Sequence, residues 1–131
     1  MDRRAAVVYV LLSTEARIAG CYTLSSDSMD AADVPEGLIK QLDLPRYDRI
    51  GVTLLGRLAR ALAWKGQGLG ELLLVDALKR AHAMSKHIAS AGVVVDAKND
   101  TAHRFYRDFG FIPFPDSEKR LFLPMATIEQ M

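Results

Sequence analysis

Cysteine is almost absent from this chain, because Cys21 is the only one in 131 residues. A lone cysteine cannot form an internal disulfide, so no disulfide framework holds the fold. Its context, Ile18 to Leu24, reads as a strand and predicts a small buried side chain at Cys21. Metal-ligating side chains are also sparse, since the three histidines, His82, His87 and His103, are scattered along the chain. We therefore expect no metal site.

An excess of either charge is also lacking. The chain has 17 basic and 16 acidic side chains, for a net charge of +1. This balance gives no global argument for binding nucleic acid or a membrane surface, so any RNA site must be a local patch. With 131 residues, of which 50% are hydrophobic, the chain can build one core. This predicts a single domain over residues 1–131.

Long apolar runs are missing as well. Arg3 and Arg4 followed by Ala5 to Leu12 superficially copy a signal peptide, but the apolar run has eight residues and is rich in β-branched side chains. No later run approaches the roughly 18 apolar residues that a membrane helix requires. We therefore expect a cytoplasmic protein with no membrane contact.

The residues that are present predict an alternation of strands and helices. Residues 5–12 and 18–24 read as a β-hairpin, residues 25–36 as a polar loop and residues 37–42 as a short helix. Further strands are expected at 50–59, 93–95, 111–114 and 119–123, and helices at 70–87 and 99–108. Asn99 and Gly110 suit the start and end of the second of these helices. Strands at both ends and two intervening βα units predict an α/β (α+β) fold, in which a mixed central sheet carries helices on both faces.

The glycine loop, Lys65-Gly66-Gln67-Gly68-Leu69-Gly70, lies between an expected strand and an expected helix. Alternate glycines let the backbone turn sharply and approach a ligand closely, and the helix start offers free N–H groups to an anion. Leu73 occupies the place of the third glycine of a dinucleotide-binding fingerprint, and Glu71 follows Gly70 where a P-loop needs lysine. The loop reads either as a phosphate cradle or as an ordinary tight strand-to-helix connection.

A second motif follows the strand at residues 93–95: Asn99-x-x-Ala102-x-x-Phe105-Tyr106-x-x-x-Gly110-Phe111. Together with the glycine loop, and in this order, it resembles the GNAT superfamily of acetyl-CoA-dependent N-acetyltransferases. The resemblance runs from about Val7 to the C-terminus. Lys65 stands where this family usually has Arg or Gln, which keeps the charge but not the planar guanidinium.

One branch of the superfamily is the more specific resemblance. Residues 45–59, the glycine loop and residues 120–125 look like the toxins of bacterial toxin–antitoxin pairs, which acetylate aminoacyl-tRNA and stop translation. Arg60-Ala61 replaces a pair that is usually apolar then acidic, and the chain is N-terminally short because a helical segment usual in the branch is missing. The branch implies charged tRNA as acceptor, a ribbon-helix-helix antitoxin as partner, and a homodimer.

The resemblance also implies roles for individual residues. The amides of the glycine loop, Lys65, Gly66, Gln67, Gly68, Leu69 and Gly70, are expected to bind the pyrophosphate of coenzyme A. Main-chain groups of Leu58, Ala59 and Arg60 are expected to pair with the pantetheine arm and the thioester, in a strand that splays from its neighbour. Asn99 and Phe105 are expected at the cofactor, and Tyr106 as the general acid for the departing thiolate. From the residues alone, the reading of Tyr106 as a packing aromatic is the preferred one, because Phe105 and Phe109 lie on the same helix and aromatic stripes are usually core.

Three functions remain open at this stage. The first is acetylation of the α-amine of aminoacyl-tRNA, as the branch implies. The second is the same chemistry on a small amine, peptide or protein N-terminus. The third is a non-catalytic coenzyme A-binding partner domain, against which the intact glycine loop, Asn99 and Tyr106 argue. A basic patch would favour the first function, and Arg46, Arg49, Arg57, Arg60, Arg104 and Arg107 are its candidates, although they also read as ordinary surface charge.

Overall fold

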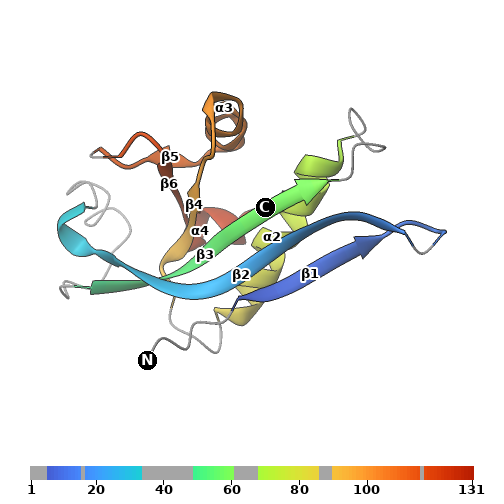
Figure 1. Ribbon diagram of the computed structural model, residues 1–131. Coiled ribbons are helices and arrows are strands. Elements are labelled where there is room, and N and C mark those ends of the chain that lie inside the picture. The colour runs from blue at the N-terminus through green and yellow to red at the C-terminus, as the bar shows by residue number, and fades with distance from the viewer. Residues whose placement is uncertain (1–5, 16, 34–48, 61–67, 86–89, 116) are drawn as a thin grey trace.

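Six strands form one sheet in the computed structural model, which describes residues 6–15, 17–33, 49–60, 68–85, 90–115 and 117–131 (Figure 1). In chain order the elements are β1 (Val7–Leu12), β2 (Ile18–Asp30), the 3-10 helix η1 (Ala31–Asp33), β3 (Arg49–Arg60), α2 (Leu69–Met84), β4 (Gly92–Asp96), α3 (Asp100–Phe109), β5 (Ile112–Pro113), β6 (Arg120–Pro124) and α4 (Met125–Glu129). The strand order is β1-β2-β3-β4-β6-β5.

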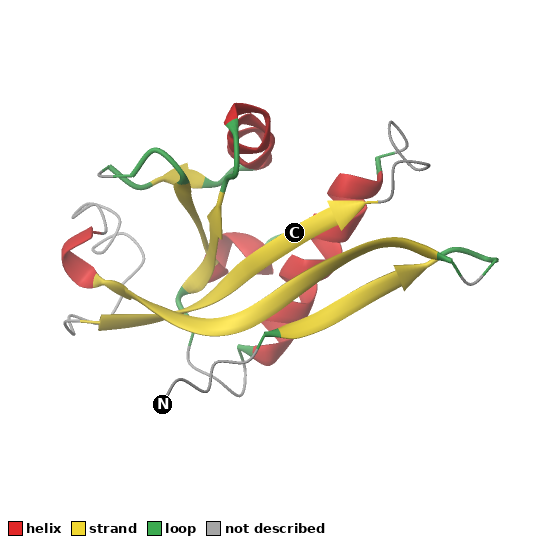
Figure 2. Cartoon of the chain, in the orientation of Figure 1, coloured by secondary structure: helices red, strands yellow, loops and turns green. Residues whose placement is uncertain are grey.

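The sheet is mixed, as the sequence predicts. β3 and β4 are parallel and are joined through α2, whereas all the other neighbouring strands are antiparallel (Figure 2). The parallel pair needs a crossover connection, which α2 supplies. Among the described helices, none combines the length and the apolar character that a membrane crossing needs.

β2 is much longer than the sequence predicts. The polar loop expected from Ser25 is wrong as far as Asp30, because these residues continue the antiparallel ladder with β3, from the pair Ser25–Leu54 to the pair Asp30–Arg49. Arg49 stabilises this end of the ladder, since its guanidinium donates to Ser28 Oγ at 2.7 Å and to the Ser28 carbonyl at 3.2 Å. The short helix expected at 37–42 lies outside the described residues.

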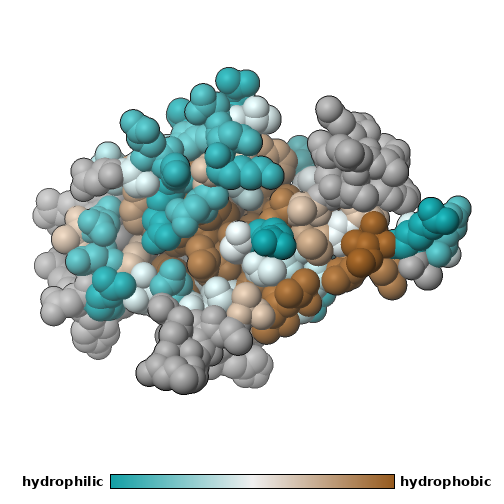
Figure 3. Space-filling model, viewed as in Figure 1, coloured by the Kyte–Doolittle hydropathy of each residue, from teal (hydrophilic) through white to brown (hydrophobic). Residues whose placement is uncertain are grey.

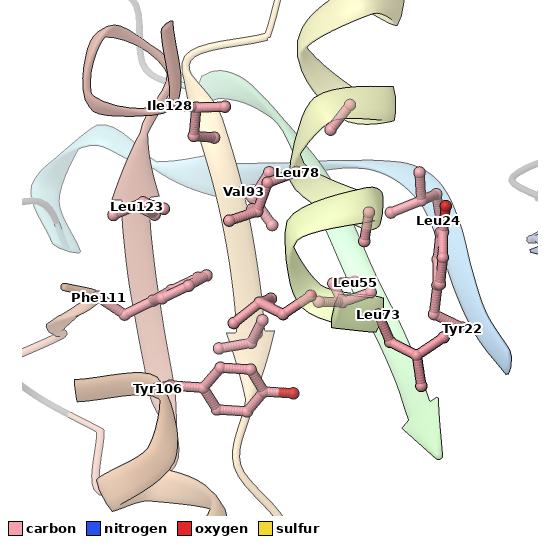
Figure 4. Packing of buried hydrophobic residues seen from close by; sticks show 14 of the residues in the cluster. Tyr22, Leu24, Leu55, Leu73, Leu78, Val93, Tyr106, Phe111, Leu123 and Ile128 are labelled. Carbon is pink, nitrogen blue, oxygen red and sulfur yellow. The ribbon is translucent and has the colours of Figure 1, made fainter. Parts of the chain in front are cut away.

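Alternate residues of the central strands supply two apolar cores on opposite faces of the sheet. In β4, Val93 and Val95 join the first core and Val94 joins the second. The first core, in part shown in Figure 4, receives buried side chains from α2, α3 and α4. Its buried members include Tyr22, Leu24, Leu55, Leu73, Leu74, Leu78, Tyr106, Phe111, Leu121 and Leu123. The second core comprises Met29, Ile50, Val52, Val94, Phe114 and Phe122.

We call the face of the sheet that carries the first core the first face, and the opposite face the second face. Cys21, which the sequence predicts as buried, is half-buried in β2. Its position opposite Val10 of β1 places it on the second face, between Gly20 and Tyr22 on the first.

Candidate functional site

The pairing of β3 with β4 stops well before β3 ends. Among the described residues it covers three pairs, from Thr53–Val93 to Leu55–Val95, yet β3 continues to Arg60. Beyond Leu55, β3 is paired only with β2 among the described strands, and Figure 1 shows β3 and β4 diverging toward the end of β3. Main-chain groups on this edge of β3 therefore have no partner among the described strands. We call residues 57–60 the free edge of β3.

The predicted thioester-binding residues all lie on this free edge. Leu58 is half-buried and packs against the first core, Ala59 is exposed, and Arg60 is the last residue of the strand. The expected splay of the strand before the glycine loop is thus present in the structure.

Within the glycine loop, a residue in the left-handed conformation immediately precedes α2. Gly68 has φ 73° and ψ 13° and is the N-cap of the helix, with no side chain capping it. A Cβ placed on Gly68 would meet no atom of a described residue within 4 Å, so the described part of the chain leaves space beside Gly68. Leu69 is buried and Gly70 half-buried, while Lys65, Gly66 and Gln67 lie outside the described residues. The amides of the first turn have no acceptor within the helix, which fits an anion in the open space.

α3 begins and ends where the sequence predicts. Asn99 is its N-cap, and Asn99 Oδ1 accepts a hydrogen bond of 2.8 Å from the Ala102 amide. Gly110 ends the helix with φ 123°, and its amide donates to the carbonyls of Tyr106 and Arg107. The oxygen of the exposed Asn99 side chain is therefore engaged in holding the helix start.

Tyr106 lies in the first core between two aromatic rings. Its ring centroid is 5.3 Å from that of Phe105 and 5.3 Å from that of Phe111, in edge-on arrangements. Figure 4 shows its hydroxyl directed away from α3, toward β3 and Leu73. Burial raises the pKa of Tyr106 above its usual value near 10, so the phenol keeps its proton at physiological pH.

Phe105 of α3 lies close to the start of α2. Its Cζ lies 3.9 Å from the place that a Cβ on Gly70 would occupy. The structure therefore brings together the end of the glycine loop, Phe105 and Tyr106, and Leu58 packs against the same core. Leu58 and Tyr106 are separated by more than a third of the chain, and the sequence predicts their meeting only through the family motifs.

The arginines considered for a basic patch do not gather in one place. Arg49 is at the first residue of β3 and Arg60 at the last, so about 35 Å of strand separates them. Arg104 and Arg107 lie on α3 beside Asp100, His103 and Asp108, and Arg46 is outside the described residues. Any patch at the free edge of β3 therefore excludes Arg49.

A part-buried set of hydrogen bonds that the sequence does not predict links the first hairpin to α2. The Tyr22 hydroxyl donates to Asp76 Oδ2 and accepts from Arg80 Nε at 3.0 Å. Arg80 also lies over the Tyr9 ring, with its guanidinium carbon 4.3 Å from the centroid. Burial and the hydrogen bond to Asp76 raise the pKa of Tyr22 to about 12. Only the spacing of Asp76 and Arg80, one helical turn apart, could have signalled these hydrogen bonds.

Comparison with known proteins agrees with this geometry. The acetyltransferase (GNAT) domain family matches residues 37–126. A probable toxin TacT of Sinorhizobium fredii is 30% identical over 95% of this chain and 72% of its own length. A tRNA-acetylating toxin of Mycobacterium tuberculosis is 36% identical over 85% of this chain and 64% of its own length.

Two solved structures are similar throughout the described fold. AtaT complexed with acetyl-methionyl-tRNAfMet has a TM-score of 0.85 and 34% identity, covering 95% of this chain and 74% of that one. A tyrosine-to-phenylalanine mutant of the AtaT toxin, bound to the C-terminus of the antitoxin AtaR and acetyl-CoA, has a TM-score of 0.76 and 28% identity, covering 95% and 70%. On the match over residues 37–126 and the similarity to these proteins, the chain belongs to the GNAT family of acetyltransferases.

Proposed function

We propose that this protein transfers the acetyl group of acetyl-CoA to the α-amine of aminoacyl-tRNA and acts as a translation-blocking toxin. The observation that carries the proposal is the meeting of three elements at one place: the free edge of β3, the left-handed start of α2 and the buried phenol of Tyr106. The tRNA-acetylating toxin at 36% identity and the AtaT complex with acetyl-methionyl-tRNA support the acceptor.

Each part of acetyl-CoA has residues that fit it. The pyrophosphate suits the amides of Gly68, Leu69 and Gly70, because no described residue fills the space beside Gly68 and the first turn of a helix has no acceptor for its own amides. We assign Lys65, Gly66 and Gln67 to the same loop on sequence grounds. The pantetheine arm and the thioester oxygen suit those main-chain groups of Leu58, Ala59 and Arg60 that face away from β2, so the arm would extend the sheet like one further strand. Phe105 would pack against the arm, and the Asn99 amide nitrogen would donate to it.

Tyr106 is the residue we assign to proton transfer. As the amine attacks, a C–N bond forms, the C–S bond breaks, and the sulfur leaves as a thiolate that needs a proton. The raised pKa keeps Tyr106 protonated, so its hydroxyl is able to give this proton. The proton lost by the amine passes to water, since an α-amine has a reference pKa near 8 and needs little help from a base. The protein contributes positioning and one acid.

We also propose an antitoxin of the ribbon-helix-helix class and a second copy of the chain as partners. The complex of AtaT with the C-terminus of AtaR supports the antitoxin. We further propose that residues 1–131 form a single N-acetyltransferase domain.

A labelling experiment tests the acceptor. The protein is incubated with radiolabelled acetyl-CoA and, in separate reactions, charged tRNAs, the same free amino acids, polyamines and peptides. We expect label on the amine of charged tRNA and almost none on free amino acids. Label on polyamines or peptides but never on charged tRNA would move the acceptor to the small-amine class.

A further inference from the structure

A β-bulge in β3 determines which face of the sheet carries the Arg57 side chain. Leu55 pairs with Leu24 and Arg57 pairs with Thr23, so Gly56 is one extra residue on the β3 side. A bulge interrupts the alternation of side chains along a strand. Without it, Arg57 would share the first face with Leu55. With it, Arg57 lies opposite Thr23 on the second face, because the neighbours of Thr23, Tyr22 and Leu24, are buried in the first core.

Glycine at the bulge is what allows the close approach of the two strands. A Cβ on Gly56 would lie 2.8 Å from Thr23 Oγ1, closer than side chains normally pack. The bulge sits directly after the last β3–β4 pair, at Leu55. The edge of β3 therefore becomes free at the bulge, and the bulge also places Arg57 on the face opposite the first core.

The first face is closed at this end of β3, whereas the second is open. Buried or half-buried apolar side chains fill the first face there: Leu58, Leu69, Leu73, Phe105 and Tyr106. On the second face Arg57 and Ala59 are exposed, and Val10 is 48% exposed. Figure 2 shows the sheet in front of α2, so Figure 3 views the second face, where brown apolar patches lie along β1 and in the middle beside white and teal residues. A bulky acceptor therefore reaches the free edge from the second face.

Arg57 is the one cation among the described strand residues at this end of the second face. Its guanidinium makes no ion pair with a described residue. Arg80 and Arg120, by contrast, are engaged with Asp76 and Asp96. Arg57 is also the immediate neighbour of Leu58, whose main chain we assign to the thioester. A guanidinium beside the reaction centre that pairs with no described carboxylate suits an anion carried by the acceptor.

We propose that Arg57 binds the phosphate nearest to the reacting amine of the acceptor RNA, and so selects RNA-linked amines over free ones. The inference rests on the proposed function. In aminoacyl-tRNA the amine is joined through an ester to the terminal ribose, whose 5′ phosphate is the first anion along the chain. A guanidinium binds such a phosphate through two parallel hydrogen bonds. A free amino acid has no phosphate to offer.

The test compares two acceptors in three variants. Arg57→Gln removes the charge, whereas Arg57→Lys keeps the charge but lacks the planar guanidinium that makes two parallel hydrogen bonds. Lys79→Gln is the control, because it removes one charge from an exposed position of α2. Each is assayed with charged tRNAs and with the methyl esters of the same amino acids, which present the amine without phosphate. Acetyl-CoA affinity and thermal midpoint are measured for all.

We expect Arg57→Gln to lower kcat/KM for charged tRNA by about 10- to 100-fold, mainly through KM, as for a lost charge-assisted hydrogen bond. The slope of log kcat/KM against log salt should become shallower by about 0.7 to 1. Rates with the methyl esters and acetyl-CoA affinity should not change. Arg57→Lys should recover the salt slope in part, and Lys79→Gln should match the parent.

Other results overturn the inference in distinguishable ways. If the parent acetylates charged tRNA and Arg57→Gln does so equally well, the Arg57 assignment fails while the proposed function stands. Equal losses with charged tRNA and with methyl esters would give Arg57 a role in the chemistry or the fold instead of phosphate binding. If the parent never acetylates charged tRNA, both the proposed function and this inference fail.

Discussion

At the scale of single residues, Tyr106 combines a place in the core with a reactive hydroxyl. Tyr106→Phe keeps the ring and its edge-on contacts with Phe105 and Phe111 but removes the acid. Turnover should fall by about 10²- to 10⁴-fold, while acetyl-CoA affinity should stay nearly unchanged. Single-turnover kinetics with calorimetric binding separate the two effects. Equal turnover of parent and variant would return Tyr106 to a packing role.

The pH profile of the parent offers an independent check on the same residue. A general acid acts while it is protonated, so activity should persist until the pH passes the raised pKa of Tyr106, which lies above about 10. An alkaline limb that begins near neutral pH in the substrate-saturated rate would point to a different acid.

Substitutions of Gly68 test whether the pyrophosphate binds at the start of α2. Gly68→Val should weaken acetyl-CoA binding by more than tenfold, because a branched side chain fills the open space and the left-handed φ of 73° strains it. Asparagine tolerates this backbone region, so Gly68→Asn should weaken binding with little loss of stability. Isothermal calorimetry and urea unfolding of both variants distinguish blocked binding from strain. Unchanged affinity in both variants would place the pyrophosphate elsewhere.

At the scale of elements, hydrogen bonds of Tyr22 with Asp76 and Arg80 connect β2 to α2. Tyr22→Phe should lower the free energy of unfolding by about 1 kcal/mol, since it removes the part-buried hydrogen bonds of the Tyr22 hydroxyl with Asp76 and Arg80. Urea unfolding at neutral pH measures this loss. Asp76→Asn is a useful companion, because it keeps an acceptor but removes the charge.

The same hydrogen bonds give a pH dependence with a definite sign. The folded pKa of Tyr22, about 12, lies above its ordinary value near 10, so folding favours the protonated phenol. Its contribution is fully present below pH 10 and is lost as the pH rises from about 10 to 12. In unfolding experiments over this range, parent and Tyr22→Phe should converge as the pH increases. Parallel curves would show that Tyr22 ionises alike in both states.

At the scale of the whole molecule, the sequence predicts the elements that carry strong local signals. Val93 to Val95 and the capped helix between Asn99 and Gly110 appear where expected, because an apolar run or a cap residue marks each. The second half of β2 is different. Its serines and aspartates favour turns, and only the long ladder with β3 holds them extended. α4 has five residues, too few for a periodic pattern.

The candidate site likewise contains residues that the sequence predicts and features that it does not. Gly68 and Tyr106 are found from motifs, because the backbone conformation and the chemistry each demand one residue type. The packing of Phe105 near Gly70 and the distance between Arg49 and Arg60 depend on how strands twist and pair, which no local pattern encodes. The bulge at Gly56 is likewise invisible in the sequence, since a glycine in a strand marks several kinds of irregularity.

The free edge of β3 has a consequence for amide hydrogen exchange. In an antiparallel pair, successive amides point alternately toward the partner strand and away from it. Within residues 57–60, slow-exchanging amides bonded to β2 should therefore alternate with fast-exchanging ones on the free edge. Coenzyme A lacks a transferable acetyl group, yet its arm should slow the fast set selectively. Exchange measured with and without it thus reports where the arm lies in a protein that is not turning over.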